Sequence, residues 1–124
     1  MGPTTYIWAL SRPVWHTSVE ISLRRGYLAD QLQRAGTSIP LNIAEGAGEY
    51  ASNEKIRFYR IAKRSATECA AIFDLCKELQ LIEISYYTEC RALLLRIVAM
   101  LIRMAQGSYK MQSGTHAGTK LVTQ

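Results

Sequence analysis

The segment that decides the fold is Ser38-Ile39-Pro40-Leu41-Asn42-Ile43-Ala44-Glu45-Gly46. It places a proline and polar residues inside a helical pattern, in which apolar residues recur every three or four positions: Leu28, Leu32, Ala35, Ile39 and Ile43. A second, mostly polar stripe has the same spacing: Gln31, Ala35, Ser38, Asn42 and Glu45. An internal proline costs a helix roughly 3 kcal/mol. We therefore expect a packed helix whose polar row faces another helix.

The composition is that of one folded domain. The chain has 124 residues, of which 48% are apolar and 20% charged, which allows a single small core and excludes a disordered chain. Lys and Arg total 15 against 10 Asp and Glu, and the net charge of +5 favours polyanionic partners such as RNA or DNA. A merely basic soluble protein is the alternative, because charge indicates a partner only through its distribution.

The cysteines and the N-terminal sequence predict a cytoplasmic protein. Cys69, Cys76 and Cys90 form no C-x-x-C pair, and the two histidines lie at opposite ends of the chain, so we expect no metal and no cofactor. Three thiols on apolar helical faces suggest buried residues in a reducing compartment. The N-terminus does not resemble a signal peptide. The most apolar stretch, 92–105, is interrupted by two arginines, so no membrane span is expected.

The first 26 residues carry the weakest helical pattern. Residues 1–13 are expected to be irregular, because Pro3 and Pro13 act as breakers. A short first helix is predicted over about 14–25, ending at Gly26.

The domain is expected to span 1–106. After residue 26 it has three stronger helical patterns, at about 27–45, 53–81 and 85–105. Ser52 or Asn53 and, later, Ser85 are the expected N-caps. The tail 107–124, rich in Gly, Ser, Thr and Gln, is expected to be disordered.

Two heptad-like seams predict the buried faces of the last two helices. The third helix has Phe58, Ala62, Ser65, Cys69, Ile72, Cys76 and Leu79. The fourth has Cys90, Leu94, Ile97, Leu101 and Met104. Because the fourth helix is apolar on nearly all sides, it is expected either at the centre of the core or under a partner subunit. The sequence therefore predicts an all-α protein.

Enzyme signatures are absent, so we expect no catalytic activity. Gly46-x-Gly48 follows a helix and lacks the third glycine and the lysine of a phosphate loop, which favours a helix end. Glu45 and Glu68 are both candidates to point into the bundle, where structural hydrogen bonds are the favoured interpretation. A metalloenzyme built on these two carboxylates is the weaker one, because the Glu-x-x-His motifs of di-iron bundles do not occur.

The polar row of the second helix has two interpretations. Its members are expected to meet Ser65 and Glu68 of the third helix, with Arg34 one position off the row. The row forms either a binding pocket or, as we favour, a buried network that fixes the helix register and compensates for Pro40.

A run of cations is the strongest sign of a binding surface: Lys55, Arg57, Arg60, Lys63 and Arg64 fall within ten residues with no acid between them. Helical spacing places the three arginines on one face, which suits phosphate groups. Tyr59 lies among them and is a candidate to stack on a base. A solvated helix face is the alternative.

The stretch from Tyr27 to about Ile82 resembles the bacterial four-helix-bundle family that includes proteins encoded in intervening sequences of 23S rRNA genes. The resemblance rests on Ser38-Ile39-Pro40-x-Asn42-Ile43-Ala44-Glu45-Gly46, preceded by Tyr27-Leu28-x-x-Gln31-Leu32-x-Arg34-Ala35. It continues with Phe58, Ile61, Ala62, Ser65, Glu68 and Leu79-x-Leu81-Ile82.

The resemblance implies an antiparallel up-and-down four-helix bundle that assembles into a ring, commonly a homopentamer. A related branch includes the accessory protein of diversity-generating retroelements, which binds nucleic acid through a basic surface and works with a reverse transcriptase. Nothing in the resemblance implies enzymatic activity. Two features depart from the family pattern. Residues 1–26 fit its longer first helix poorly, and Arg64 replaces the small residue usually found before Ser65.

These observations predict a cytoplasmic homo-oligomer that binds structured RNA such as rRNA. Phosphate contacts are assigned to Arg57, Arg60, Lys63 and Arg64, with Arg34 and Tyr59 as further candidates. The bundle is expected to be held by Gln31, Ser38, Pro40, Asn42, Glu45, Gly46, Ser65 and Glu68. A protein-interaction scaffold, for a partner such as a reverse transcriptase, is the alternative.

Overall fold

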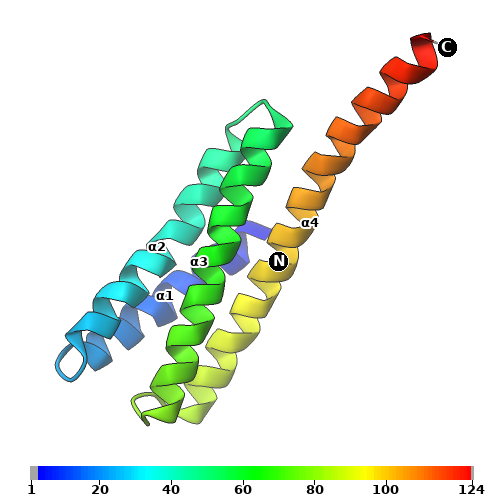
Figure 1. Cartoon of the computed structure of the whole chain (residues 1–124). Coiled ribbons are helices and arrows are strands. Elements are labelled where there is room, and N and C mark those ends of the chain that lie inside the picture. The colour runs from blue at the N-terminus through cyan, green and yellow to red at the C-terminus, as the bar shows by residue number, and fades with distance from the viewer. Residues whose placement is uncertain (1–2, 124) are drawn as a thin grey trace.

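The computed structural model describes residues 3–123 and, within them, the side chains of residues 7–110. Within this part of the chain there are four helices and no strand: α1 (Pro3–Ser22), α2 (Gly26–Ala47), α3 (Ser52–Glu78) and α4 (Ile84–Thr123). The expected all-α, up-and-down four-helix bundle is confirmed. Each helix packs on two neighbours and not on its diagonal partner. Figure 1 shows the α1–α2 and α3–α4 turns at one end and the α2–α3 turn at the other.

The predicted seams of α3 and α4 form the central part of the buried faces of these two helices. From the seams, every residue between Ala62 and Cys76 and between Cys90 and Leu101 is buried. Leu79 and Met104, at the ends of the two seams, are only partly covered. Phe73, Leu32 and Ile39 are fully enclosed, each contributing about 1.5–3 kcal/mol to folding.

The prediction of an irregular segment before residue 14 was wrong from Pro3 onward. The predicted short helix is the second half of one helix of 20 residues, which contains Pro13 and ends at Ser22. The prolines do not break it, because a helix tolerates proline in its first turn and apolar burial outweighs one internal proline. This burial involves a regular face of Ile7, Leu10, Val14 and Ile21. Gly26 begins α2 and does not end α1.

Two further boundaries differ from the sequence prediction. The residue before α3 is Ala51, which gives no side-chain cap, while the Asn53 carboxamide oxygen accepts a hydrogen bond from the backbone N–H of Glu54 at 3.0 Å. The tail expected to be disordered from Gly107 is helical to Thr123 (Figure 1). Extending a formed helix requires no new nucleation, and no proline interrupts residues 107–123.

Close packing of α1 on α2 depends on a small residue. A Cβ atom on Gly36 would lie 2.7 Å from Val14 Cγ1, so the helices approach more closely than alanine permits. Beside this contact the Gln33 carboxamide donates a hydrogen bond of 3.0 Å to the hydroxyl of Ser18, a buried residue. None of the helices in the described part of the chain combines the length and hydropathy of a membrane span.

Candidate nucleic-acid interface

The predicted cations lie along the first half of α3. Arg57, Arg60, Lys63 and Arg64 all have exposed side chains. Among the described residues, Arg60, Lys63 and Arg64 form no ion pair. These three residues, which we name the α3 cations, give one surface with uncompensated positive charge.

Arg57 is held more firmly than its neighbours. Its Nη2 atom lies 3.1 Å from the Glu54 Oε2 atom, and its guanidinium group lies 4.5 Å from the centroid of the Phe58 ring. The ion pair offsets part of its charge. Arg57 therefore remains exposed, but it offers less free charge to a ligand than the α3 cations do.

Lys55 has a structural task. Its ammonium group donates hydrogen bonds to the carbonyl oxygens of Gly46 at 3.2 Å and Ala47 at 3.3 Å. These carbonyls belong to the last turn of α2, where intrahelical partners run out and a positive charge is favourable. Lys55 thus ties the start of α3 to the end of α2.

Helix α4 adds a further cation, Lys110, and an aromatic ring, Tyr109, to this surface. A hollow of about 380 Å³ between α3 and α4 is lined by Ile56, Arg60, Ala105, Gln106, Tyr109 and Lys110. We name it the α3–α4 hollow. Tyr109 is 63% exposed, so its ring is accessible. An exposed ring that shares a hollow with two cations can stack on a base while the cations hold adjacent phosphates.

Tyr59 does not belong to this surface, contrary to the sequence prediction. Only 6% of it is exposed, because it packs against the end of α2. A Cβ atom on Gly46 would lie 2.5 Å from the Tyr59 Cε1 atom, which explains the glycine at this position. Burial also raises the pKa of the Tyr59 hydroxyl. The ring therefore seals the α2–α3 end of the bundle and cannot reach a base.

Arg34 is exposed on α2, apart from the α3 cations. It lines a hollow of about 310 Å³ together with Gln31, Ala35, Ser38, Ser65 and Glu68. The carboxylate of Glu68 in the same hollow offsets the charge of Arg34. This surface is therefore weaker for phosphate than the α3 cations.

The predicted polar network exists in a smaller form. The Ser65 hydroxyl donates to the Ser38 hydroxyl at 2.8 Å, and the Asn42 amide donates to the carbonyl oxygen and the hydroxyl of Ser38 at 2.8 and 2.9 Å. These bonds flank Pro40 on α2 and join α2 to α3. Net contributions of about 0.5–1.5 kcal/mol each offset much of the proline's cost.

The acids expected inside the bundle are at its surface. Glu45 and Glu68 are exposed, because a charged carboxylate without a buried partner is more stable in water. Gln31, a neutral member of the predicted polar row, is exposed as well. The described residues contain no group of three His, Cys, Asp or Glu side chains able to hold a metal.

The three thiols are free and buried, as the sequence predicted. Burial, with a smaller effect of Glu68, raises the pKa of Cys69 to about 12. Burial, with Glu89, raises the pKa of Cys90 likewise to about 12. The side chain of Arg64, the departure from the family pattern, points to solvent and leaves the Ser65 contact intact.

Some surface residues escaped the sequence analysis. Tyr109 and Lys110 lie in the segment that was expected to be disordered. Trp8, Trp15 and Val19 are 66%, 64% and 52% exposed and lie along one face of α1, at spacings of seven and four residues. We name them the α1 stripe. Their periodicity is visible in the sequence once Pro13 is accepted inside a helix.

Comparison with known proteins assigns the chain to a family. A comparison with curated proteins and one with solved structures gave no match. The model of the family described as 23S rRNA-intervening sequence protein matches residues 10–103, which extends the stretch that carries the motif on both sides. Because this match covers more than half of the chain, the protein belongs to the 23S rRNA-intervening sequence protein family.

Proposed function

We propose that the protein is a non-catalytic homo-oligomer that binds structured RNA, such as rRNA, through the α3 cations and the α3–α4 hollow. The observation that carries the proposal is that Arg60, Lys63 and Arg64 are exposed and form no ion pair among the described residues. Guanidinium and ammonium groups in this state are suited to phosphate oxygens.

The hollow favours RNA with unpaired bases. Tyr109 offers a ring to a base that has left a helix, and Arg60 and Lys110 lie on the same hollow to contact the flanking phosphates. Unstacked bases in loops and bulges are what proteins read in RNA, because the deep groove of an RNA duplex is inaccessible to side chains.

Self-assembly is supported by the α1 stripe. Two tryptophans and a valine on one exposed helix face are unusual for a monomer surface, and tryptophan is enriched in protein interfaces. A closed ring would repeat the α3 cations around its axis, which raises the affinity for a polyanion. The pentamer itself is inferred from the family resemblance.

Charge reversal tests the RNA surface. We expect Arg60→Glu/Arg64→Glu to weaken binding of a hairpin RNA at least tenfold in fluorescence anisotropy, with an unchanged thermal midpoint. Binding by the unaltered protein should also weaken strongly between 50 and 200 mM salt. The matched control is Arg24→Glu, an exposed cation at the opposite end. Equal losses in the variant and the control, or salt-independent binding, would refute the proposal.

A protein-interaction scaffold is the second candidate, and the α1 stripe favours it equally. Light scattering of Trp15→Glu separates the two uses of the stripe. A fall from ring to monomer mass would assign the stripe to self-association. A ring that persists in this variant, and that ignores RNA in the unaltered protein, would assign the stripe to a different protein.

A further inference from the structure

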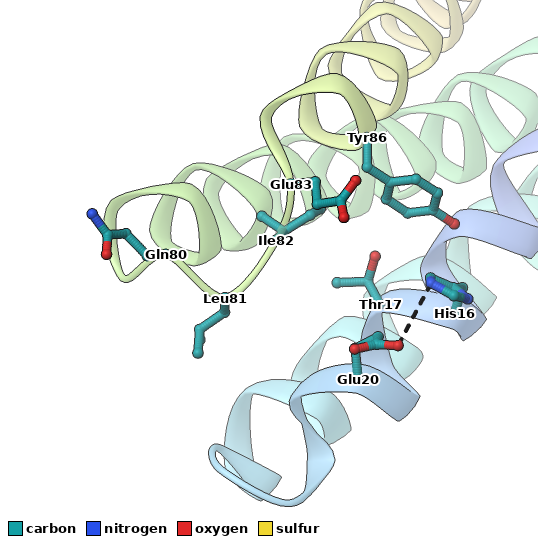
Figure 2. A pocket seen from close by; sticks show the side chains of 8 residues that line it. All are labelled: His16, Thr17, Glu20, Gln80, Leu81, Ile82, Glu83 and Tyr86. Atoms are coloured by element: carbon teal, nitrogen blue, oxygen red, sulfur yellow. Dashed lines mark ion pairs between the residues drawn. The ribbon is translucent and has the colours of Figure 1, made fainter.

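A hollow of about 360 Å³ lies at the end of the bundle farthest from the α3 cations. It is bounded by α1 and by the α3–α4 turn with the first turn of α4. Figure 2 shows Glu83 and Tyr86 opposite His16, Thr17 and Glu20. We name it the α1–α4 hollow. Its volume is at the lower end of the range for small-molecule sites.

One hydroxyl group in this hollow, that of Thr17, is not hydrogen-bonded to any described residue. The hydroxyl is buried, with 2% of the residue exposed. In Figure 2 it points from α1 towards Glu83 and Tyr86. A buried hydroxyl without a partner is costly. A ligand in the hollow could supply the missing bond.

The charge of the hollow is opposite to that of the protein as a whole. Glu20 and Glu83 contribute carboxylates from its two sides, while the chain carries a net charge of +5. The Glu20 Oε1 atom lies 3.8 Å from His16 Nε2, too far for a strong bond, so it retains acceptor capacity. Arg12, one turn before His16, lies near enough to act on Tyr86, but it is outside the lining of the hollow.

The rest of the lining is aromatic and aliphatic. The rings of His16 and Tyr86 are tilted at 50° with centroids 5.1 Å apart, and Leu81 and Ile82 complete the wall. Aromatic faces and carboxylates both favour a cation, and the aliphatic side chains favour a methylene chain. Because the described residues bring no three metal ligands together, an organic cation fits the hollow better than a metal ion.

We propose that the α1–α4 hollow binds a small organic cation, an ammonium or guanidinium group on a short methylene chain. The carboxylates of Glu20 and Glu83 neutralise the cation, Thr17 accepts one of its hydrogen bonds, and Tyr86 covers the chain. The site is independent of the RNA surface, which lies at the other end of the bundle.

Calorimetric titration of the full chain with putrescine and agmatine tests the site, with 1,4-butanediol as the neutral analogue of putrescine. The diamine and agmatine should bind and the diol should not. Glu20→Gln and Glu83→Gln should each weaken binding about tenfold, and Asp30→Asn, an exposed acid outside the hollow, should leave it unchanged. RNA affinity should be unchanged in all three variants.

Thr17→Val provides a second test, in which a loss of cation binding is expected together with a gain in stability and therefore cannot result from misfolding. Replacing an unpartnered hydroxyl by a methyl group should raise the thermal midpoint and weaken cation binding severalfold. N-acetyl-argininamide then identifies the source of the cation: binding as tight as that of agmatine indicates an arginine side chain of a protein, and preference for agmatine indicates a free amine. Binding of the diol, absence of binding by either cation at millimolar concentration, or equal losses in Asp30→Asn would overturn the proposal.

Discussion

At the α2–α3 end of the bundle, the Tyr59 ring fills the space over Gly46 and the Lys55 ammonium group closes the last carbonyls of α2. At the α3–α4 end, by contrast, α1 and the turn leave a hollow with two carboxylates and a buried hydroxyl, which has no partner within the part of the chain that the structure describes. The contact between α2 and α3 at the first end is closed, with the α3 cations nearby. The hollow at the second end is open and lined by two carboxylates.

The difference supports the proposal that this four-helix bundle carries two kinds of binding surface. Outside the α3–α4 hollow, the basic surface presents exposed charges, which suits an extended polyanion. The α1–α4 hollow combines exposed carboxylates with one buried hydroxyl in a concave site, which suits a small ligand. Because the two proposed sites differ in charge, we expect no competition between their ligands.

High pH tests whether the hollow reaches the core. Cys69 and Cys90 have pKa values near 12 in the folded protein and titrate near 9 when unfolded. Their stabilising effect is therefore complete below pH 9 and is lost between pH 9 and 12. Each thiol should lower the unfolding free energy by about 1.4 kcal/mol per pH unit in that window.

Urea unfolding at pH 9 and 11 measures this slope. Cys69→Ala and Cys90→Ala should reduce it equally. If Cys90→Ala leaves the slope unchanged, water from the α1–α4 hollow already reaches Cys90. The hollow would then extend into the core.

Gly46→Ala tests the sealed end directly. The new Cβ atom would lie 2.5 Å from the Tyr59 ring, and overpacking of this kind destabilises by about 1–3 kcal/mol. Thermal unfolding should show a clear drop in midpoint. Gly48→Ala is the matched control, since its Cβ atom would meet only backbone oxygens at 3.6 Å. An unchanged midpoint for Gly46→Ala would show that the end is loosely packed.

Ser65→Ala removes the bond between α2 and α3 beside Pro40. We expect a loss of about 1 kcal/mol in chemical unfolding, because Ser38 then loses one of its donors inside the bundle. Ser11→Ala, on the exposed side of α1, should be neutral. A neutral Ser65→Ala would mean that the network does not offset the proline.

Gln80→Gly tests the α3–α4 turn, and here we expect the substitution to stabilise the protein. Gln80 has φ 55°, the left-handed conformation that glycine adopts without a Cβ penalty. The substitution should stabilise the protein by about 0.5–1 kcal/mol, seen as a higher thermal midpoint. Destabilisation would indicate that the Gln80 side chain makes a contact that supports the turn.

The sequence was informative where helical periodicity was unbroken. The seam from Ala62 to Cys76 predicted the buried face of α3 because each step of three or four residues returns to the same side. Tyr59 was misplaced because it lies among cations in the sequence. It stands three residues before Ala62, and on a helix that spacing puts it on the core face.

Prolines and glycines caused the larger errors. Pro13 was taken as a break in α1, although Leu10 and Val14 on either side already had core spacing. The Gly-rich composition after residue 106 predicted disorder and hid Tyr109 and Lys110. Local preferences of about 1–3 kcal/mol were outweighed in α1 by burial and in α4 by propagation of an existing helix. The α1–α4 hollow joins segments about 60 residues apart, so no local pattern could reveal it.

The position of Lys55 changes the number of counterions that RNA binding can release. Five cations occur in the run from Lys55 to Arg64, but one ammonium group already serves the carbonyl end of α2 and Arg57 is paired with Glu54. Three cations of the run remain, and Lys110 adds a fourth phosphate contact in the proposed interface, so each protomer on duplex nucleic acid should give a logarithmic salt slope of about −3.6. The fold thus leaves fewer free positive charges for a ligand than the five cations counted in the sequence.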